Sequence, residues 1–383
     1  MIKVGALIRV IDMPQDDHSI YFSNAVLLLH MAASYGVELF LFSHKDIDLK
    51  NNTLNGLFVE DGKLVRHLAP IPPIVDNKTA ATRTDKVTTE LFAQLKERTS
   101  FTRNFTNFAK WGQYERLSSD SEFSHLVIPT RRLQKDPDLR RLCDELGDDL
   151  ILKPENSSRG RGIVGVRRAG GGFEVIVDDI ETRLMAPEEL KEFIGGFTEN
   201  YIAQTRVDST LSSGRPFDVR ILVQRKDADS HAFVMYPRIG GGRIKSNLAA
   251  GGRTMPIDTF LAEFFCEMAD EAKAKLEAFA RTFPPYFQKF LKYPFFDMGL
   301  DIGIERVDGS IRLRLFEVNQ FPNFSFKGNY GELHYEIARA TLACYRYLHG
   351  RLAAEAQVAE AEALAQAQVA EALAAEAQAA AKL

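Results

Sequence analysis

Three oxygen-bearing side chains lie in two neighbouring stretches of predicted β-structure. Glu317 and Asn319 lie in "LFEVNQFP", Asp301 lies in "MGLDIGIE", and the turn "RVDGS" comes between them. In a hairpin, alternation puts Glu317 and Asn319 on one face, and antiparallel pairing can bring Asp301 alongside. Mg²⁺ typically takes one or two carboxylates together with phosphate oxygens and water. Each residue alone reads as a hydrogen-bonded strand-end residue, whereas the three together predict a magnesium site.

A glycine-rich loop could supply the phosphate side of such a site. In "LILKPENSSRGRGI" (150–163), Lys153 ends an apolar strand just before the loop. Glycines let a backbone approach phosphates, and its N–H groups can cradle them. A strand follows this loop, unlike the Walker A pattern, in which a helix follows. A hairpin turn and a surface lysine are the plain alternatives. Lys110, in "NFAKWGQY", could face the same phosphates, although alone a solvated lysine is the simpler interpretation.

Two further stretches carry basic residues. "FDVRILVQ" puts Asp218 and Arg220 on one face of a strand, either as a structural salt bridge or with Arg220 placed to grip a transferred phosphoryl group. The loop "GGGRIKSNLAAGG" (240–252) is either a mobile surface loop or a basic anion-binding loop beside a γ-phosphate, through Asn247 and its neighbours. Three basic residues in and before this loop are Arg238, Arg243 and Lys245. They suggest that the acceptor substrate is acidic or rich in carboxylates, such as a peptide or amino acid.

Composition is that of a globular protein. The 383 residues are 45% apolar and 26% charged, with a net charge of -4, so no basic excess points to nucleic acid. Three scattered cysteines, Cys143, Cys266 and Cys344, suggest reduced and mostly buried thiols. No run approaches the roughly 20 apolar residues that span a bilayer. We therefore expect a cytoplasmic protein without membrane or nucleic-acid partners.

The expected elements describe a mixed α/β and α+β fold. A strand at 2–11, a helix ending at Gly36 and a strand from Val37 predict a small α/β domain with a parallel sheet. We expect "LAPIPPIVDN" to lead into an irregular connection and "HLVIPTRRL" to form a strand and then a turn. We also expect an amphipathic helix at "PDLRRLCDELGD" and one long helix over roughly 257–282. The predicted domain bounds are 1–100, 101–200, 201–350 and 351–383.

The last segment, 351–383, is rich in Ala, Glu and Gln, and "AQVAEA" occurs in it twice. Alanine has the highest helix propensity, so a helix is predicted here. An oligomerisation arm is one interpretation. A solvated helix is the other, because the apolar stripe is thin.

Taken in order, these stretches resemble the ATP-grasp superfamily, and within it the YheC/YheD group, described as spore-coat-associated. The stretches that carry the likeness are "LILKPENSSRGRGI", "GRPFDVRILVQ", "RIKSNLAAGG", "MGLDIGIE" and "LFEVNQFP". The pairing of "DVR" with "SNLAAGG" also resembles glutathione synthetase and the ribosomal-protein glutamate ligases. The resemblance implies an ATP-grasp fold with a pre-ATP-grasp α/β domain in front and a nucleotide between two α+β subdomains.

The resemblance also implies roles around the nucleotide. Lys110 and Lys153 match two phosphate-contacting lysines. The loop that closes over the phosphates is matched by Asn156, Ser157, Ser158, Arg159, Gly160, Arg161 and Gly162. The hinge that hydrogen-bonds adenine is matched by Gln204, Thr205, Arg206 and Val207, with Asp208 for the ribose. Arg206 departs from the acidic or apolar residue expected in that hinge.

For the chemistry, Arg220 and Asn247 match residues near the transferred phosphate, and Asp301, Glu317 and Asn319 match the ligands of two Mg²⁺ ions, with Mn²⁺ as the alternative. The implied activity is an ADP-forming carboxylate–amine ligase that makes an amide through an acyl phosphate. A structural or coat-associated protein that retains the fold without ligation is one alternative, and a small-molecule kinase is another. "VDNKTAATRTD" replaces a tyrosine/asparagine–arginine stretch of the group, and the alanine-rich tail has no counterpart in it.

Overall fold

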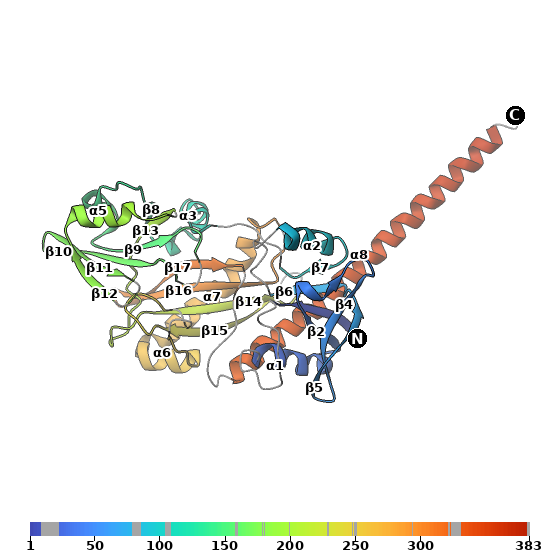
Figure 1. Cartoon of the computed structure of the whole chain (residues 1–383), viewed down its shortest axis with the longest axis horizontal. Helices are drawn as coiled ribbons and strands as arrows, with labels where there is room; N and C mark the ends of the chain where they lie inside the picture. The colour runs from blue at the N-terminus through green and yellow to red at the C-terminus, as the bar shows by residue number, and fades with distance from the viewer. Residues whose placement is uncertain are drawn as a thin grey trace. The chain divides into compact units, whose positions relative to one another are not determined.

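The structure is a computed structural model. It describes residues 1–8, 23–78, 86–103, 109–157, 160–177, 179, 181–198, 200–227, 230–246, 248, 251–292, 294–320, 322 and 331–380. The chain divides into two compact units. Unit 1 comprises Met1–Thr102, Lys226–Ala228 and Ala338–Leu383, and unit 2 comprises Arg103–Arg225 and Asp229–Ile337. Most elements of both units are labelled in Figure 1.

Unit 1 is built on a mixed sheet with the order β3-β4-β2-β1-β6-β7, to which β5 adds by pairing with β4. Its parallel part confirms the predicted α/β opening, since β1 pairs in parallel with both β2 and β6. The strands are β1 (Ile2–Leu7), β2 (Val37–Phe42), β3 (Ile47–Asp48), β4 (Thr53–Glu60), β5 (Lys63–Pro70), β6 (Ile74–Asn77) and β7 (Ser100–Phe101). The helices are α1 (Ser23–Ala32) and α2 (Lys86–Lys96).

The stretch "LAPIPPIVDN" itself contains strand structure, while residues 79–85, the connection that it is predicted to lead into, lie outside the described residues. Its first residues end β5 and its last four form β6, which is fully buried between β1 and β7. The prolines fall at a strand end and ahead of the next strand, where a missing N–H interrupts no ladder. A four-residue central strand is too short to show a period, so only its parallel neighbours reveal it.

Unit 2 contains a six-stranded sheet with the order β12-β11-β10-β9-β13-β8. The predicted strand–loop–strand around the glycines is confirmed as β9 and β10. The strands are β8 (Thr130–Arg132), β9 (Asp149–Pro154), β10 (Val164–Ala169), β11 (Gly172–Val177), β12 (Glu181–Met185) and β13 (Tyr201–Thr205). The helices are α3 (Lys110–Ser118), α4 (Leu139–Leu146) and α5 (Pro187–Gly195). The strand expected in "HLVIPT" lies later, because Ser124–Leu126 form a turn of 3₁₀-helix and pairing starts at Thr130.

A four-stranded antiparallel sheet, with the order β15-β14-β16-β17, forms the rest of unit 2. Its strands are β14 (Phe217–Arg225), β15 (His231–Ile239), β16 (Asp297–Val307) and β17 (Ser310–Asn319). The helices α6 (Ile257–Phe265) and α7 (Ala269–Gln288) pack on one face of it (Figure 1). The single helix expected over 257–282 is wrong, since Cys266 takes a φ of 48° and ends α6. Cys266 is also exposed, unlike the buried Cys143 and Cys344.

The alternation of β14 separates an apolar face from a charged one. Val219, Ile221 and Val223 join the core beneath α6 and α7, while Asp218 and Arg220 are buried on the opposite face. Side chains in a strand alternate between faces, so the polar residues of "DVRILVQ" share one side. The face of β14 that is covered by helices therefore packs into the hydrophobic core, and its opposite face carries the ionisable side chains.

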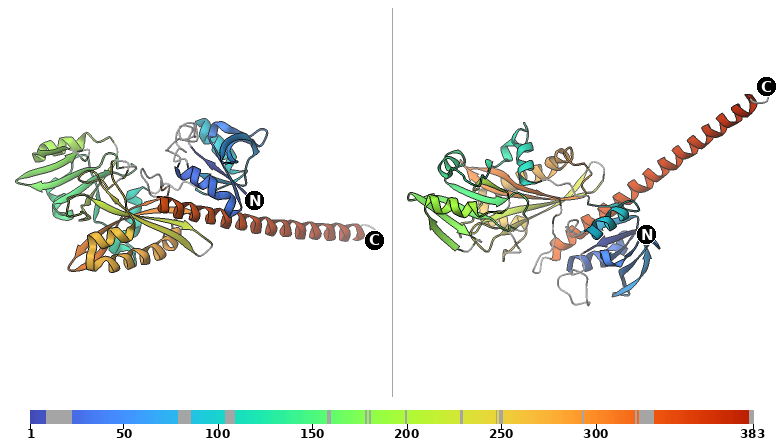
Figure 2. Two further views of the ribbon diagram at one scale, coloured as in Figure 1. Left: turned by 90° about the horizontal axis from the view of Figure 1, so that it is seen from below. Right: turned by 45° about the horizontal axis from the view of Figure 1, so that its top comes forward.

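The predicted tail helix is confirmed, and it begins earlier than expected. Helix α8 runs from Gly331 to Ala380 and is unbroken (Figure 2). Leu342, Tyr345 and Leu348 are buried along one side, whereas residues 353–368 are all exposed. Within the described residues, no helix combines the length and the apolar character that crossing a membrane requires.

Candidate functional site

One row of side chains crosses the four-stranded sheet from edge to edge. Tyr236 of β15 is paired with Arg220 of β14, Arg220 with Asp301 of β16, and Asp301 with Glu317 of β17. Residues directly opposite each other in antiparallel strands point to the same face. The register shifts between Asp301 and Ile302, which is a β-bulge beside Glu317. The hairpin therefore brings two of the three predicted metal ligands together, as the sequence pattern anticipates.

Asp301 is held by several donors. Arg220 bonds both carboxylate oxygens, through Nε and at 3.1 Å through Nη2, and Arg238 lies 2.9 Å away. Asn319 also donates to Asp301, from Nδ2 at 3.1 Å. Burial alone would raise the pKa of Asp301, but the two arginines outweigh it and hold that pKa below its usual value. Asp301 is therefore an anion in a largely water-free setting.

Arg238, which is predicted as a substrate contact, is also part of this network. It bonds Asp218 through Nε at 2.6 Å and Nη2 at 2.5 Å, and Ser246 donates to the same carboxylate at 2.5 Å. Asp218 and Asp301 hold the pKa of Arg238 well above its usual value despite burial, which acts the other way. The structural salt bridge left open for Asp218 thus exists, but with Arg238, while Arg220 pairs with Asp301.

Lys110 approaches Glu317 from α3. Its Nζ lies 3.7 Å from Glu317 Oε1 and donates to the backbone carbonyl of Ser157 at 2.7 Å. Gln113, one turn further along α3, bonds both backbone groups of Val318, at 3.1 and 2.9 Å. Gln113 thereby fixes the start of α3 beside β17, which places Lys110 next to the predicted metal ligand. The sequence gives no signal for this role, because an amide in a helix has no distinctive pattern.

Lys153 is buried at the end of β9. Its ammonium donates to Gln204 at 2.7 Å, and Gln204 donates to Thr130 at 2.9 Å. Burial, aided by Lys110, lowers the pKa of Lys153 to about 8, against the opposing pull of Glu317 and Asp301. A cation with so little solvent has a strong preference for an incoming anion.

The predicted phosphate loop is described in part. Ser158 and Arg159 lie outside the described residues, whereas Asn156 and Arg161 are exposed. Gly162 has a φ of 71°, and a Cβ there would lie 2.7 Å from the hydroxyl of Tyr201 and 3.0 Å from Pro154. Only glycine fits this turn without moving its neighbours.

The predicted adenine hinge comprises the end of β13 and the first residues after that strand. Thr205 donates to the carbonyl of Leu146 at 2.7 Å, and Val207 is buried. Arg206 lies 3.6 Å from Asp149 and donates to the carbonyl of Arg243 at 3.0 Å. Asp208 has an exposed side chain. The unexpected arginine of the hinge is thus accounted for by a structural contact.

The predicted ligands suit a hard divalent cation. Two carboxylates and one amide offer oxygen donors on one sheet face, in the ligand class that Mg²⁺ prefers. Among the described residues, no three His, Cys, Asp or Glu side chains cluster as a metal site, so the set depends on Asn319. Asn247, predicted near the γ-phosphate, lies outside the described residues.

Comparison with known proteins identifies the family of the chain. The profile described as YheC/D like ATP-grasp matches residues 99–348. This chain belongs to that family. No curated protein matches the chain in sequence. The predicted superfamily and fold class are therefore confirmed, and membership supports an ATP-binding ligase in general terms.

Solved structures similar to this ATP-grasp protein are distant in sequence. The D-cycloserine synthetase DcsG is 12% identical, with a TM-score of 0.47, and the match covers 89% of this chain and 99% of DcsG. The D-alanyl-alanine synthetase A of Vibrio cholerae is 10% identical, with a TM-score of 0.47 and 90% and 97% coverage. The N5-carboxyaminoimidazole synthetase of Staphylococcus aureus is 11% identical, with a TM-score of 0.47 and 90% and 77% coverage.

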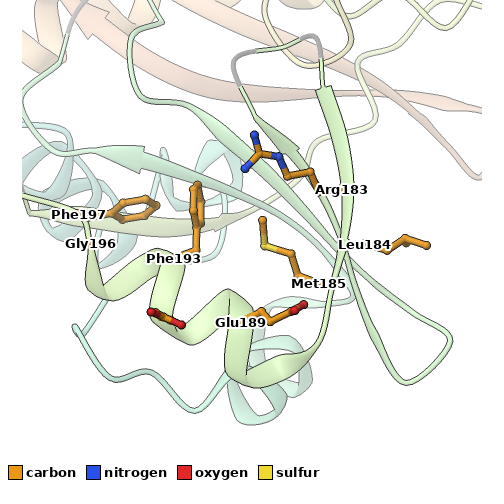
Figure 3. Close-up of a pocket in the computed structure, with 8 residues that line it drawn as sticks. Arg183, Leu184, Met185, Glu189, Phe193, Gly196 and Phe197 are labelled. Atoms are coloured by element: carbon orange, nitrogen blue, oxygen red, sulfur yellow. The ribbon is translucent and has the colours of Figure 1, made fainter.

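A shallow groove of about 680 Å³ lies elsewhere on this ATP-grasp protein, between β12 and α5. Met185, Phe193, Phe197 and Leu184 are among the residues that line it, and the 82% exposed side chain of Leu184 points away from the other three (Figure 3). The groove contains none of the residues predicted to bind nucleotide or metal. Arg183, Glu189 and Glu192 also line it, so its surface combines apolar and charged side chains.

Proposed function

We propose that the protein is an ADP-forming carboxylate–amine ligase. The observation that carries the proposal is the row of paired residues Arg220, Asp301 and Glu317, with Lys110 against its end. Two anions, one arginine and one lysine on a single sheet face match the needs of phosphoryl transfer, in which catalysis is mostly positioning and charge stabilisation. Family membership supports the ATP-dependent part of this proposal.

The ligand set for the cation would be Asp301, Glu317 and Asn319, with Mg²⁺ as the first choice and two ions expected. When bound, such ions neutralise phosphate oxygens as negative charge builds on them. Asp301 and Glu317 are partners in register, so one ion could contact both. Mn²⁺ has the same preference for oxygen ligands.

The remaining residues would hold the nucleotide. Lys110 and Lys153 would face the phosphates, and the loop 156–162 would cover them. Gln204, Thr205, Arg206 and Val207 would contact adenine, with Asp208 at the ribose and Asn247 near the γ-phosphate. In this scheme residues 1–100 form the pre-ATP-grasp domain, 101–200 contribute the lid, and 201–350 contribute the metal site.

In the proposed reaction, a substrate carboxylate oxygen attacks the γ-phosphorus and ADP leaves. An amine nitrogen then attacks the acyl carbon, loses a proton and displaces phosphate. Arg220 would stabilise the charge on the transferring group. Arg238, Arg243 and Lys245 would lie toward the substrate side. Excluding water protects the acyl phosphate from hydrolysis, which is the role that the glycine loop would fill.

A protein that binds nucleotide without ligation is the second candidate. One observation favours it, because two arginines already neutralise Asp301. A cation would have to compete with that pairing. Turnover therefore decides between the two candidates.

The test is phosphate release from Mg-ATP with panels of amino acids and peptides, each supplied as carboxylate, amine or both. A ligase releases phosphate only when both partners are present. A kinase instead transfers phosphate to one acceptor, and a non-catalytic protein binds ATP without turnover. Glu317→Gln should abolish turnover with the fold intact, while Glu188→Gln, at an exposed position of α5, should not. Unchanged turnover in Glu317→Gln would remove that residue from the mechanism.

A further inference from the structure

The segment 240–246, here called the anion loop, is bonded to the six-stranded sheet by one carboxylate. Oδ1 of Asp179 accepts the backbone N–H groups of Arg243 at 2.7 Å and of Ile244 at 2.6 Å. Asp179 lies between β11 and β12 and is only 8% exposed. Hydrogen bonds from backbone N–H groups to a buried carboxylate are charge-assisted and about twice as strong as neutral ones.

The glycines of the anion loop are shaped to this contact. A Cβ on Gly242 would lie 1.9 Å from Oδ2 of Asp179. A Cβ on Gly240 would lie 2.0 Å from the carbonyl oxygen of Lys245. No side chain fits at these distances, so both glycines are required by close approach rather than by a need for flexibility.

Other contacts join the same two parts of unit 2. Arg243 donates to the hydroxyl of Thr182 at 2.5 Å, and Arg206 donates to the carbonyl of Arg243 at 3.0 Å. At the far end of the loop, Lys245 packs against Gly160, where an added Cβ would lie 3.4 Å from Lys245 Cδ. Asp179 thus holds the middle of the anion loop, and the next residue, Lys245, contacts the predicted phosphate loop.

Asp179 itself adopts an unusual backbone conformation, with a φ of 69°. Residues other than glycine rarely occupy this left-handed region, and aspartate is among those that do. Such outliers persist when the surrounding structure fixes them, and they concentrate at functional sites. Here the two N–H groups of the anion loop provide that fixation.

We propose that Asp179 is a positioning residue that anchors the anion loop to the β11–β12 turn and thereby sets Lys245 beside Gly160. Its effect on nucleotide binding rests on the proposed function, but the anchoring does not. Residue 179 touches neither the predicted metal ligands nor the predicted adenine hinge. It would act on the site only through the loop.

The test is site-specific trypsin cleavage after Arg243 and Lys245 in the full-length protein without nucleotide. Asp179→Gly removes the carboxylate and still permits a positive φ. Cleavage at both sites should rise at least about tenfold, because losing two charge-assisted hydrogen bonds raises the open population that the protease samples. Asp308→Gly is the matched control, since Asp308 also has a positive φ, of 52°, in the β16–β17 turn. Equal cleavage in wild type and Asp179→Gly would overturn the proposal.

Two further variants separate anchoring from general loosening. Asp179→Asn keeps Oδ1 and should restore cleavage rates to between those of wild type and Asp179→Gly. Gly242→Ala should speed cleavage in the wild-type background, because its Cβ meets Asp179, and should add little to Asp179→Gly. Additive effects of the two changes, or no difference between Asn and Gly at residue 179, would contradict a direct contact.

Binding of Mg-ATP, measured by calorimetry on the same variants, tests the consequence for the site. Asp179→Gly should weaken it severalfold and Asp308→Gly should leave it unchanged. If the wild type binds no nucleotide, the proposed function fails while the cleavage experiment still decides the anchor. If nucleotide binds equally to all variants, the anchor has no role in placing Lys245 and the proposal fails.

Discussion

The two sheets of unit 2 differ in how far their ion pairs are buried. On the four-stranded sheet, the ion-paired side chains of Arg220 and Asp301 are each 8% exposed, and that of Asp218 is 4% exposed. In the ion pairs of the six-stranded sheet one partner is well exposed, even where the other is buried, as in the pair of Arg132 (60% exposed) with Glu155 (8%). Arg168, which is 37% exposed, pairs with Asp144 and Asp148, which are 67% and 61% exposed.

A net gain in stability is a weak explanation for the buried charges. Exposed pairs contribute about 0 to 1 kcal/mol, and buried pairs lose to desolvation much of what they gain from attraction. Well-packed apolar residues would stabilise the four-stranded sheet equally well. A charged row that survives in such a setting points to chemistry on that face, as perturbed ionisable groups often do.

Arg220→Ala should have the largest effect of the variants proposed for the two sheets. We expect ATP turnover to fall by about 10³-fold with a smaller change in nucleotide affinity, because the arginine would act on charge that develops in the transition state. Steady-state phosphate release and equilibrium binding measure the two effects. Arg168→Ala, on the outer surface, is the control. A loss confined to affinity would contradict the assigned role.

Arg238→Met tests how much stability is lost when one partner is removed from the buried ion pairs. It removes the partner of Asp218 and one partner of Asp301, and should lower the free energy of unfolding by about 3 kcal/mol. Adding Asp218→Asn should recover part of that loss, since one uncompensated anion is then removed. Chemical denaturation measures both. A double variant less stable than the single one would show that the carboxylate is not the source of the cost.

Lys153→Met tests the buried cation through pH. Burial lowers the pKa of Lys153 from 10.5 to about 8, so the unfolded chain holds this proton more tightly than the folded one. The resulting destabilisation is full below about pH 8 and disappears as the pH rises through the unfolded value.

The stability of the wild type, relative to Lys153→Met, should therefore rise by about 2 kcal/mol between pH 7 and pH 9.5. Denaturation at the two pH values measures it. Lys191→Met, at a 49% exposed position, is the control for loss of a lysine. A flat difference for Lys153→Met would mean that its ammonium is not desolvated.

Arg168→Met should have the smallest effect. Its pairs with Asp144 and Asp148 are exposed and screened, so we expect a change in the free energy of unfolding below about 1 kcal/mol. Thermal denaturation at low and high salt measures it. A loss of unfolding free energy as large as that of Arg238→Met would contradict the difference inferred between the ion pairs of the two sheets.

Much of the β16–β17 hairpin can be predicted from its amino-acid sequence. In "MGLDIGIE" and "LFEVNQFP", alternation within each strand and a tight turn between them fix which residues share a face, and the register pairs Asp301 with Glu317. The glycine loop between β9 and β10 can also be predicted, because its signal lies in a short stretch of sequence. By contrast, β6 escapes prediction because four residues carry no period, and the break at Cys266 escapes it because its φ depends on surrounding packing.

The sequence by itself determined the order of the elements, the charged face of β14 and the family, because these depend on spacing along the chain. Only the tertiary structure decided the partners. Asp301 of β16 meets Arg238 of β15 across the intervening strand β14, Gln113 fixes α3 to Val318, and Asp179 reaches the backbone of Arg243 and Ile244. The reason is physical: a side chain's partner is chosen by proximity in the folded state, and residues more than sixty positions apart leave no periodic trace of the contact.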